Sequence, residues 1–85
     1  GLDLAKVREA RHQEQAAAFR DLNRQELEIL ARLADGLTNR EIGAELGLSE
    51  KTVRNYVSTI LGKLNLTSRV QAAAYAARNR VEDYL

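Results

Sequence analysis

The sequence predicts an all-α fold, and two local patterns together with the chain length support this prediction. Apolar residues recur at spacings of three and four over residues 49–64, which is typical of a helix with one buried side. Three expected helix starts carry a capping residue followed three positions later by Glu or Gln, which is the capping-box pattern. A chain of 85 residues is long enough for one small domain with one modest core.

The composition excludes several classes of function. The chain has no Cys and one His, so it cannot form a disulfide, a thiolate metal site or a zinc site built on His residues. It has no long apolar run, no secretory signal and no lipidation pattern. We therefore expect a cytoplasmic protein with no cofactor and no bound metal. Because the sequence contains no Met, we interpret it as a fragment of a longer protein.

The charges are distributed unevenly along the chain. The net charge of +1 alone argues against a strongly basic nucleic-acid binder. Residues 1–35 contain six bases and seven acids, whereas residues 36–69 contain five bases and three acids. The small positive surplus therefore lies around the helix predicted over residues 49–64.

The N-terminal segment is predicted to form a helix over residues 1–21. Residues 2–19 consist mainly of Ala, Glu, Gln, Arg and Lys, which are strong helix formers. Their apolar stripe is thin and interrupted, so this helix needs a surface on which to pack. We expect Leu4, Val7 and Phe19 to dock on a partner subunit or on the rest of the chain.

Two further helices are predicted between residues 23 and 47. Asn23 and Glu26 form the first capping box, and Gly36 ends this helix because Gly adopts the left-handed conformation readily. Thr38 and Glu41 form the second capping box, at the start of a helix of about two turns. The inward positions are predicted to be Leu27, Leu30, Leu33 and Ala34, flanked by Ile29, and then Ile42 and Leu46.

Gly43 and the turn at residues 47–49 connect these helices to the next one. Gly43 lies in mid-helix, where Gly costs about 0.5–1 kcal/mol relative to Ala, so we expect it to permit close approach of another helix. Residues 47–49 read Gly-Leu-Ser and form a short turn. Two short helices, a tight turn containing Gly and a polar outer face on the second helix describe a helix-turn-helix.

The helix predicted over residues 49–64 is the main candidate for a functional surface. Its polar face contains bases, an amide and a hydroxyl group but no acid, namely Lys51, Arg54, Asn55, Ser58 and Gly62. Such a set can donate hydrogen bonds to phosphates and to base edges. Ser49 is placed to cap the first turn. The alternative reading is an ordinary solvated helix surface.

The last predicted helix starts at Ser68, with Gln71 in the capping-box position, and it is rich in Ala. One of its sides carries Val70, Ala73, Ala74 and Ala77, and a second side carries Ala72, Tyr75, Ala76 and Asn79. We expect one side to close the core and the other to be available for a partner helix. Residues 81–85 show no clear pattern and are predicted to be a tail that frays.

Residues 22–77, about two-thirds of the chain, resemble the LuxR-type helix-turn-helix domain, the output domain of NarL/FixJ-class response regulators and of quorum-sensing regulators. The combined pattern is GLTNREIG, LSEKTV, KLNL and a following Arg. The matching residues are Leu22, Glu26, Leu30, Ala34, Gly36, Leu37, Asn39, Glu41, Ile42, Leu46, Ser49, Thr52, Val53, Ile60, Lys63, Leu64, Leu66, Arg69 and Ala72. The resemblance implies a four-helix domain whose third helix enters the major groove and whose fourth helix pairs two subunits.

The resemblance also implies roles for individual residues. Lys51, Arg54 and Asn55 match base-reading positions, and the acid-free face singles out the same three residues independently. The expected backbone contacts are Thr38, Asn39, Ser49, Thr52, Tyr56, Ser58 and Lys63. The expected dimer contacts are Val70, Ala73, Ala74 and Ala77. Helix capping explains Thr38, Ser49 and Thr52 equally well, and Tyr56 can instead pack beside Val53 and Ile60.

The predicted function is sequence-specific binding of double-stranded DNA as the output domain of a bacterial transcriptional regulator. The resemblance implies a two-component response regulator that binds inverted repeats as a dimer, weakly paired without DNA, with RNA polymerase as a candidate partner. Two alternatives stay open, a sigma-factor region 4 domain and a helical dimerisation module. The spacing from Arg69 to Ala72 argues against the first, and the acid-free face is unexplained by the second.

Catalysis is not expected of this chain. No nucleophile is paired with a base, and the Gly residues form no loop suited to phosphate binding. The predicted organisation is therefore a linker helix over residues 1–21, a DNA-binding domain over residues 22–80 and a tail over residues 81–85. A regulatory domain is expected upstream of Gly1.

Overall fold

The computed structural model describes residues 17–85, which form four α-helices and a short 3-10 helix. The elements are α2 (Arg24–Ala34), α3 (Asn39–Leu46), α4 (Glu50–Leu64), α5 (Arg69–Arg78) and η1 (Val81–Tyr84). This part of the chain contains no strand, so the predicted all-α class is confirmed. The predicted linker helix lies mostly outside the described residues, and so do Leu4 and Val7.

The helices begin where the capping patterns predicted. The Asn23 side chain accepts a hydrogen bond from the Glu26 N–H (2.9 Å), and the Glu26 carboxylate accepts one from the Asn23 N–H (2.9 Å). Thr38 and Glu41 form the same reciprocal pair. The box predicted at Ser68 is only half formed. Ser68 accepts from the Gln71 N–H, but the Gln71 amide oxygen accepts instead from the N–H and the hydroxyl of Thr67.

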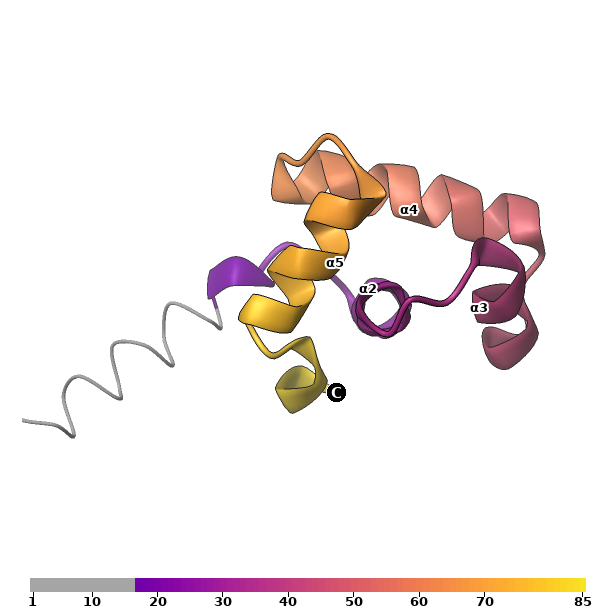
Figure 1. Cartoon of the computed structure of the whole chain (residues 1–85), viewed down its shortest axis with the longest axis horizontal. Helices are drawn as coiled ribbons and strands as arrows, with labels where there is room; N and C mark the ends of the chain where they lie inside the picture. The colour runs from indigo at the N-terminus through magenta and orange to yellow at the C-terminus, as the bar shows by residue number, and fades with distance from the viewer. Residues whose placement is uncertain (1–16) are drawn as a thin grey trace, which may run out of the picture.

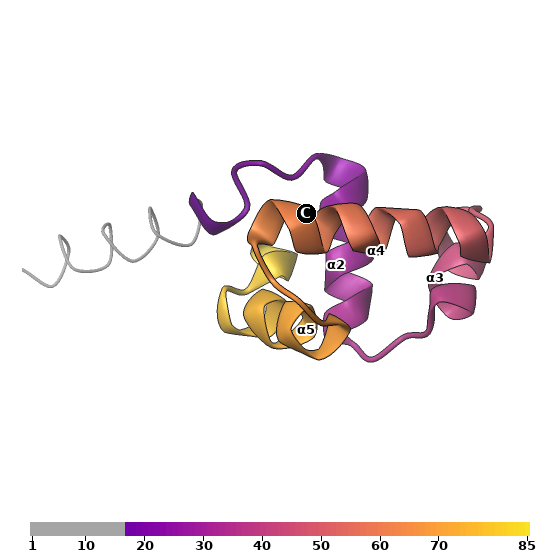
Figure 2. The same cartoon turned by 90° about the horizontal axis from the view of Figure 1, so that it is seen from above.

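Helix α2 lies at the centre of the domain, with α4 across it and α5 and α3 on either side (Figures 1 and 2). Ile29 and Leu30 of α2 are fully buried, together with Ile60 of α4. The prediction that Ile29 only flanks the buried stripe is wrong. Leu27 and Ala34, which were expected inside, are half-buried, so the inward face of α2 is centred one position away from the predicted stripe.

Helices α3 and α4 form the predicted helix-turn-helix around Gly43 and Gly47. Gly47 ends α3 in the left-handed conformation, with φ of 71°. A Cβ atom on Gly43 would overlap the backbone carbonyl of Leu48 in the turn. Gly43 therefore does permit a close approach. The prediction that the neighbour is another helix is wrong, because the neighbour is the backbone of the turn.

Gly43→Ala should lower the free energy of unfolding by about 1–3 kcal/mol, because the added methyl group forces the turn away from α3. Urea unfolding followed by circular dichroism measures this change. Gly62→Ala is the matched control, since no atom lies within 4 Å of the added Cβ. It should raise the stability by up to about 1 kcal/mol through helix propensity. Equal responses of the two variants would show that the turn yields at no cost.

The C-terminal residues pack against the domain, so the prediction that residues 81–85 fray is wrong. Val81 is fully buried, and η1 lies against α2. The ring of Phe19 is buried between Tyr75 and Tyr84, with ring centroids 6.0 Å and 5.3 Å from it. The Tyr75 hydroxyl donates a hydrogen bond to the Ala18 carbonyl (3.2 Å). Burial raises the pKa of Tyr75, and the charge of Arg78 partly offsets this rise.

Candidate nucleic-acid interface

Helix α4 presents a polar face to solvent along its whole length. Its inner side buries Val53, Val57 and Ile60, which fixes the rotation of the helix on α2. The polar face of α4 consists of Lys51, Arg54, Asn55, Ser58 and Gly62, and all five residues are exposed. The structure therefore brings the three predicted base-reading side chains together on one open surface.

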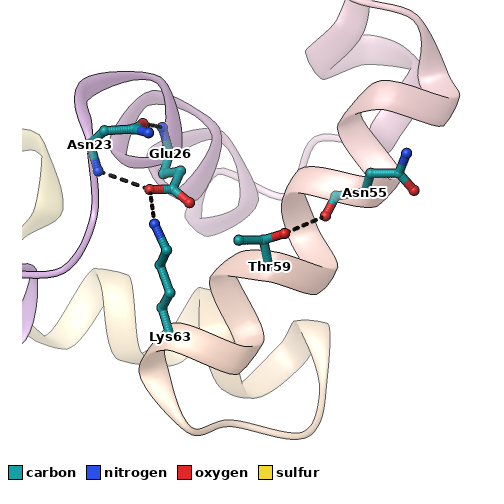
Figure 3. Close-up of polar contacts among 5 residues, drawn as sticks. All are labelled: Asn23, Glu26, Asn55, Thr59 and Lys63. Atoms are coloured by element: carbon teal, nitrogen blue, oxygen red, sulfur yellow. Dashed lines mark hydrogen bonds and ion pairs between the residues drawn. The ribbon is translucent and has the colours of Figure 1, made fainter.

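Thr59 is also exposed beside this face, although the sequence reasoning did not single it out. Its hydroxyl donates a hydrogen bond to the Asn55 carbonyl (3.1 Å), four residues earlier in the helix (Figure 3). The donor of this Thr hydroxyl is therefore used within its own helix. The carboxamide of Asn55 extends away from this bond towards solvent (Figure 3).

The start of α4 is capped by two of the predicted backbone-contacting residues. Ser49 Oγ accepts a hydrogen bond from the Thr52 N–H (3.0 Å) and donates one to Thr52 Oγ1 (2.8 Å). Both side chains therefore have a structural role at the positive end of the helix. Their role as phosphate contacts stays a prediction. Tyr56, which is half-buried, packs against the hydrophobic core, and its role as a backbone contact also stays a prediction.

The start of α3 carries Thr38, Asn39 and a negatively charged neighbour. The Thr38 N–H donates to the Glu41 carboxylate (2.9 Å), and the Glu41 N–H donates to Thr38 Oγ1 (3.1 Å). Hydrogen bonding of the Glu41 carboxylate with the Thr38 backbone N–H and, second, with the Thr38 side chain lowers the pKa of Glu41. Glu41 therefore stays ionised at neutral pH and serves the cap of α3.

Arg69, the first residue of α5, ties the start of α5 to the start of α3. Its guanidinium donates one hydrogen bond to Asn39 Oδ1 and another to the Leu37 carbonyl. Arg69 was one of the residues that carry the family resemblance, but the sequence assigned it no contact. The Asn39 side chain, a predicted contact of the DNA backbone, is thus hydrogen-bonded to the first residue of α5.

Lys63 is paired with the buried carboxylate of Glu26. Lys63 Nζ lies 2.8 Å from Glu26 Oε1, and the Glu26 side chain is only 2% exposed (Figure 3). The same oxygen accepts the Asn23 N–H, so one carboxylate caps α2 and anchors the C-terminal end of α4. The prediction that Lys63 contacts the DNA backbone is not tested by this pairing, but part of its charge is already compensated inside the protein.

The predicted dimer residues lie on the outer side of α5. Val70 is 77% exposed, Ala74 and Ala77 are exposed, and Ala73 is half-buried. The opposite side buries Ala72 and Ala76 completely against α2 and its neighbours. Of the two sides predicted for this helix, the one with Ala72 and Ala76 therefore closes the core, and the one with Val70 and Ala74 faces outward.

Two further features are absent from residues 17–85. None of their acids forms a group of three or more side chains placed to hold a metal ion. None of their helices combines the length and the apolar character that crossing a bilayer requires.

Comparison with known proteins identifies the family of the chain. Residues 20–76 match the family described as bacterial regulatory proteins, luxR family. The transcriptional regulatory protein LiaR of Bacillus subtilis is 47% identical over 68 residues, which is 80% of this chain and 32% of LiaR. The transcriptional activator DevR/DosR of Mycobacterium tuberculosis is 42% identical over 73 residues, 86% of this chain and 33% of that protein.

A probable HTH-type transcriptional regulator of Streptomyces halstedii, GfsR, is 61% identical over 51 residues, 60% of this chain and 21% of GfsR. The chain therefore spans a third or less of the length of these curated relatives. The family match covers both helices of the helix-turn-helix and most of α5. This chain belongs to the luxR family of bacterial regulatory proteins, and it is a DNA-binding output domain of a transcriptional regulator and not an enzyme.

Proposed function

We propose that the polar face of α4 enters the major groove and that Lys51, Arg54 and Asn55 read base edges there. The observation that carries this proposal is the exposure of all three side chains on one side of α4, whose only acid is Glu50 at the first residue of the helix. Lys and Arg match the O6 and N7 acceptors of guanine, and Asn can pair with adenine through two hydrogen bonds. The major groove of B-DNA admits one α-helix, so the polar face of α4 can reach the base edges there.

The backbone contacts in this proposal surround the base-reading residues. They are Thr38, Asn39, Ser49, Thr52, Tyr56, Ser58 and Lys63. Thr38 and Asn39 lie at the start of α3, while Ser49 and Thr52 lie at the start of α4, and we propose that both helix starts approach the DNA backbone. Exposed N–H groups and hydroxyls at helix starts are favourable partners for phosphates.

Arg54→Ala should weaken binding to the preferred site by about 1–3 kcal/mol and relax the preference at one or two base pairs. Selection of sites from a random-sequence DNA pool, followed by anisotropy titrations, measures both effects. Arg24→Ala is the control, because it removes an equal charge from an exposed side chain on α2. If Arg54→Ala kept the full sequence preference, the proposed orientation of α4 in the groove would be wrong.

We further propose that two copies pair through the outer side of α5, with Val70, Ala73, Ala74 and Ala77 in the contact. These small side chains allow two helices to approach closely but bury little area, so the pair should be weak without DNA. A two-fold pair corresponds to an inverted repeat whose half-site centres lie about one helical turn apart, roughly 10 bp.

Ala74→Glu should abolish most of the cooperativity between two half-sites and leave binding to a single half-site unchanged. The reason is that a charge on the outer side of α5 would meet its own copy across the two-fold axis. Titration of duplexes with one or two half-sites measures the cooperativity. Ala74→Ser keeps a small side chain and should bind as the parent chain does. Unchanged cooperativity in Ala74→Glu would place the dimer contact elsewhere.

The cellular role in this proposal is that of a response regulator. LiaR and DevR/DosR, whose names describe transcriptional regulation, support it. A regulatory domain upstream of residue 1 would then control pairing of the output domains, and RNA polymerase is a candidate partner on DNA. We propose the bacterial cytoplasm as the compartment, because that is where the DNA lies.

A further inference from the structure

The hydrogen bonds of Arg69 join the start of α5 to the start of α3. Asn39 and Arg69 are 30 residues apart in sequence, and the guanidinium joins the first residue of α5 to the first residue of α3. A second hydrogen bond from the same group to the Leu37 carbonyl holds the chain just before α3. Two donors of one planar group therefore define the approach of α3 to α5.

The chemistry of the pair determines which way the Asn39 side chain is turned. A guanidinium has only donors, so the atom of the carboxamide that faces it must be the oxygen. The NH2 group of Asn39 then lies on the side of the carboxamide away from Arg69. A phosphate accepts hydrogen bonds and repels a carbonyl oxygen, so this is the orientation in which Asn39 can bind a DNA backbone.

We infer that Arg69 is a positioning residue for DNA binding, which acts by holding the Asn39 carboxamide with its NH2 group outward. This inference rests on the proposed binding of the DNA backbone by α3. Arg69 itself is half-buried and contacts protein groups through its two terminal nitrogens. Its effect on DNA is therefore transmitted through Asn39 and contributes affinity without base preference.

A double-mutant cycle of Arg69→Lys and Asn39→Ala tests the inference. The probe is a duplex half-site selected from a random-sequence pool by the unmodified chain, with a scrambled duplex beside it. Each single variant should lose about three- to tenfold in affinity, the value of one hydrogen bond, and should keep the same preferred sequence. The double variant should bind no more weakly than Asn39→Ala alone, because Arg69 has then nothing to orient.

Losses that multiply in the double variant would overturn the inference, since Arg69 would then act on DNA independently of Asn39. Full affinity of Arg69→Lys would overturn it too, because a single ammonium group cannot replace the two guanidinium nitrogens that reach Asn39 and the Leu37 carbonyl separately. Failure of the proposed function looks different: the unmodified chain would bind the selected and the scrambled duplex equally. Circular dichroism melts confirm that each variant is folded at the assay temperature.

A measurement on the unmodified chain keeps the test decisive if Arg69→Lys does not fold. The side-chain NH2 signals of Asn39 are assigned in a nitrogen-15 spectrum by their absence from the Asn39→Ala spectrum. They should shift when the selected duplex is added. Unshifted signals in the bound state would show that Asn39 makes no contact with DNA, and the inference would fall.

Discussion

Lys63→Met should lower the free energy of unfolding by about 3 kcal/mol, the lower end of the range for breaking a buried ion pair. The loss arises because the Glu26 carboxylate, only 2% exposed, would lose its cationic partner. The value is at the lower end because the Lys63 side chain is itself 36% exposed. Urea unfolding measures the change through the shift of the midpoint.

The double variant Glu26→Gln, Lys63→Met is the control for this interpretation. A Gln at position 26 keeps an oxygen that can accept the Asn23 N–H but brings no buried charge. The double variant should therefore be more stable than Lys63→Met alone. If it were less stable, the packing of the Lys63 chain, and not the ion pair, would account for the loss.

The same variant tests the predicted backbone contact of Lys63. A lysine that neutralises a phosphate contributes about 0.9 to the slope of log affinity against log salt concentration. Lys63→Met should reduce the slope by this amount only if the ammonium group leaves Glu26 to reach the DNA. An unchanged slope would assign Lys63 to the anchoring of α4.

Phe19→Ala should lower the free energy of unfolding by about 3–5 kcal/mol, as expected for the loss of a buried aromatic ring. The ring is 4% exposed and lies against Tyr75 and Tyr84, so its removal opens a cavity between α5 and η1. Thermal unfolding measures the loss.

Two truncated chains test where the domain begins. A chain that starts at residue 17 keeps Phe19 and the Ala18 carbonyl. Its free energy of unfolding should therefore equal that of the full chain. A chain that starts at residue 21 lacks both and should lose about as much stability as Phe19→Ala. Equal stability of the two truncations would contradict a core role for Phe19. The burial of Phe19 and the hydrogen bond to the Ala18 carbonyl lead us to propose that residues 17–20 belong with the folded domain, although the sequence assigned them to the linker.

The sequence could predict the helix starts because capping is local. Asn23, Thr38 and Ser49 each bond within three residues, so their patterns survive without knowledge of the fold. The exposed face of α4 was predictable for the same reason, since helical periodicity separates it from Val53 and Ile60. The grouping of Lys51, Arg54 and Asn55 on that face needs no tertiary information.

The parts that could not be predicted depend on contacts between distant residues. Arg69 meets Asn39 across 30 residues and Lys63 meets Glu26 across 37, and no local pattern encodes either pair. Both sides of α5 contain Ala residues, so the packing on α2 decides which one is buried. Val81 and η1 have no periodic signal, and they are held by one buried side chain and by the contact of Tyr84 with the Phe19 ring.

Phe19 connects the segment before α2 to α5 through its contact with Tyr75. The chain arrives at α5 from its inner side, through the contact of Phe19 with Tyr75. Tyr75 lies between Ala74, which faces outward, and Ala76, which is buried. A twist applied upstream of residue 17 would thus be delivered directly to the helix whose outer side is proposed to pair. The two ring contacts of Phe19 are with α5 and η1 and not with α4, the helix proposed to read DNA.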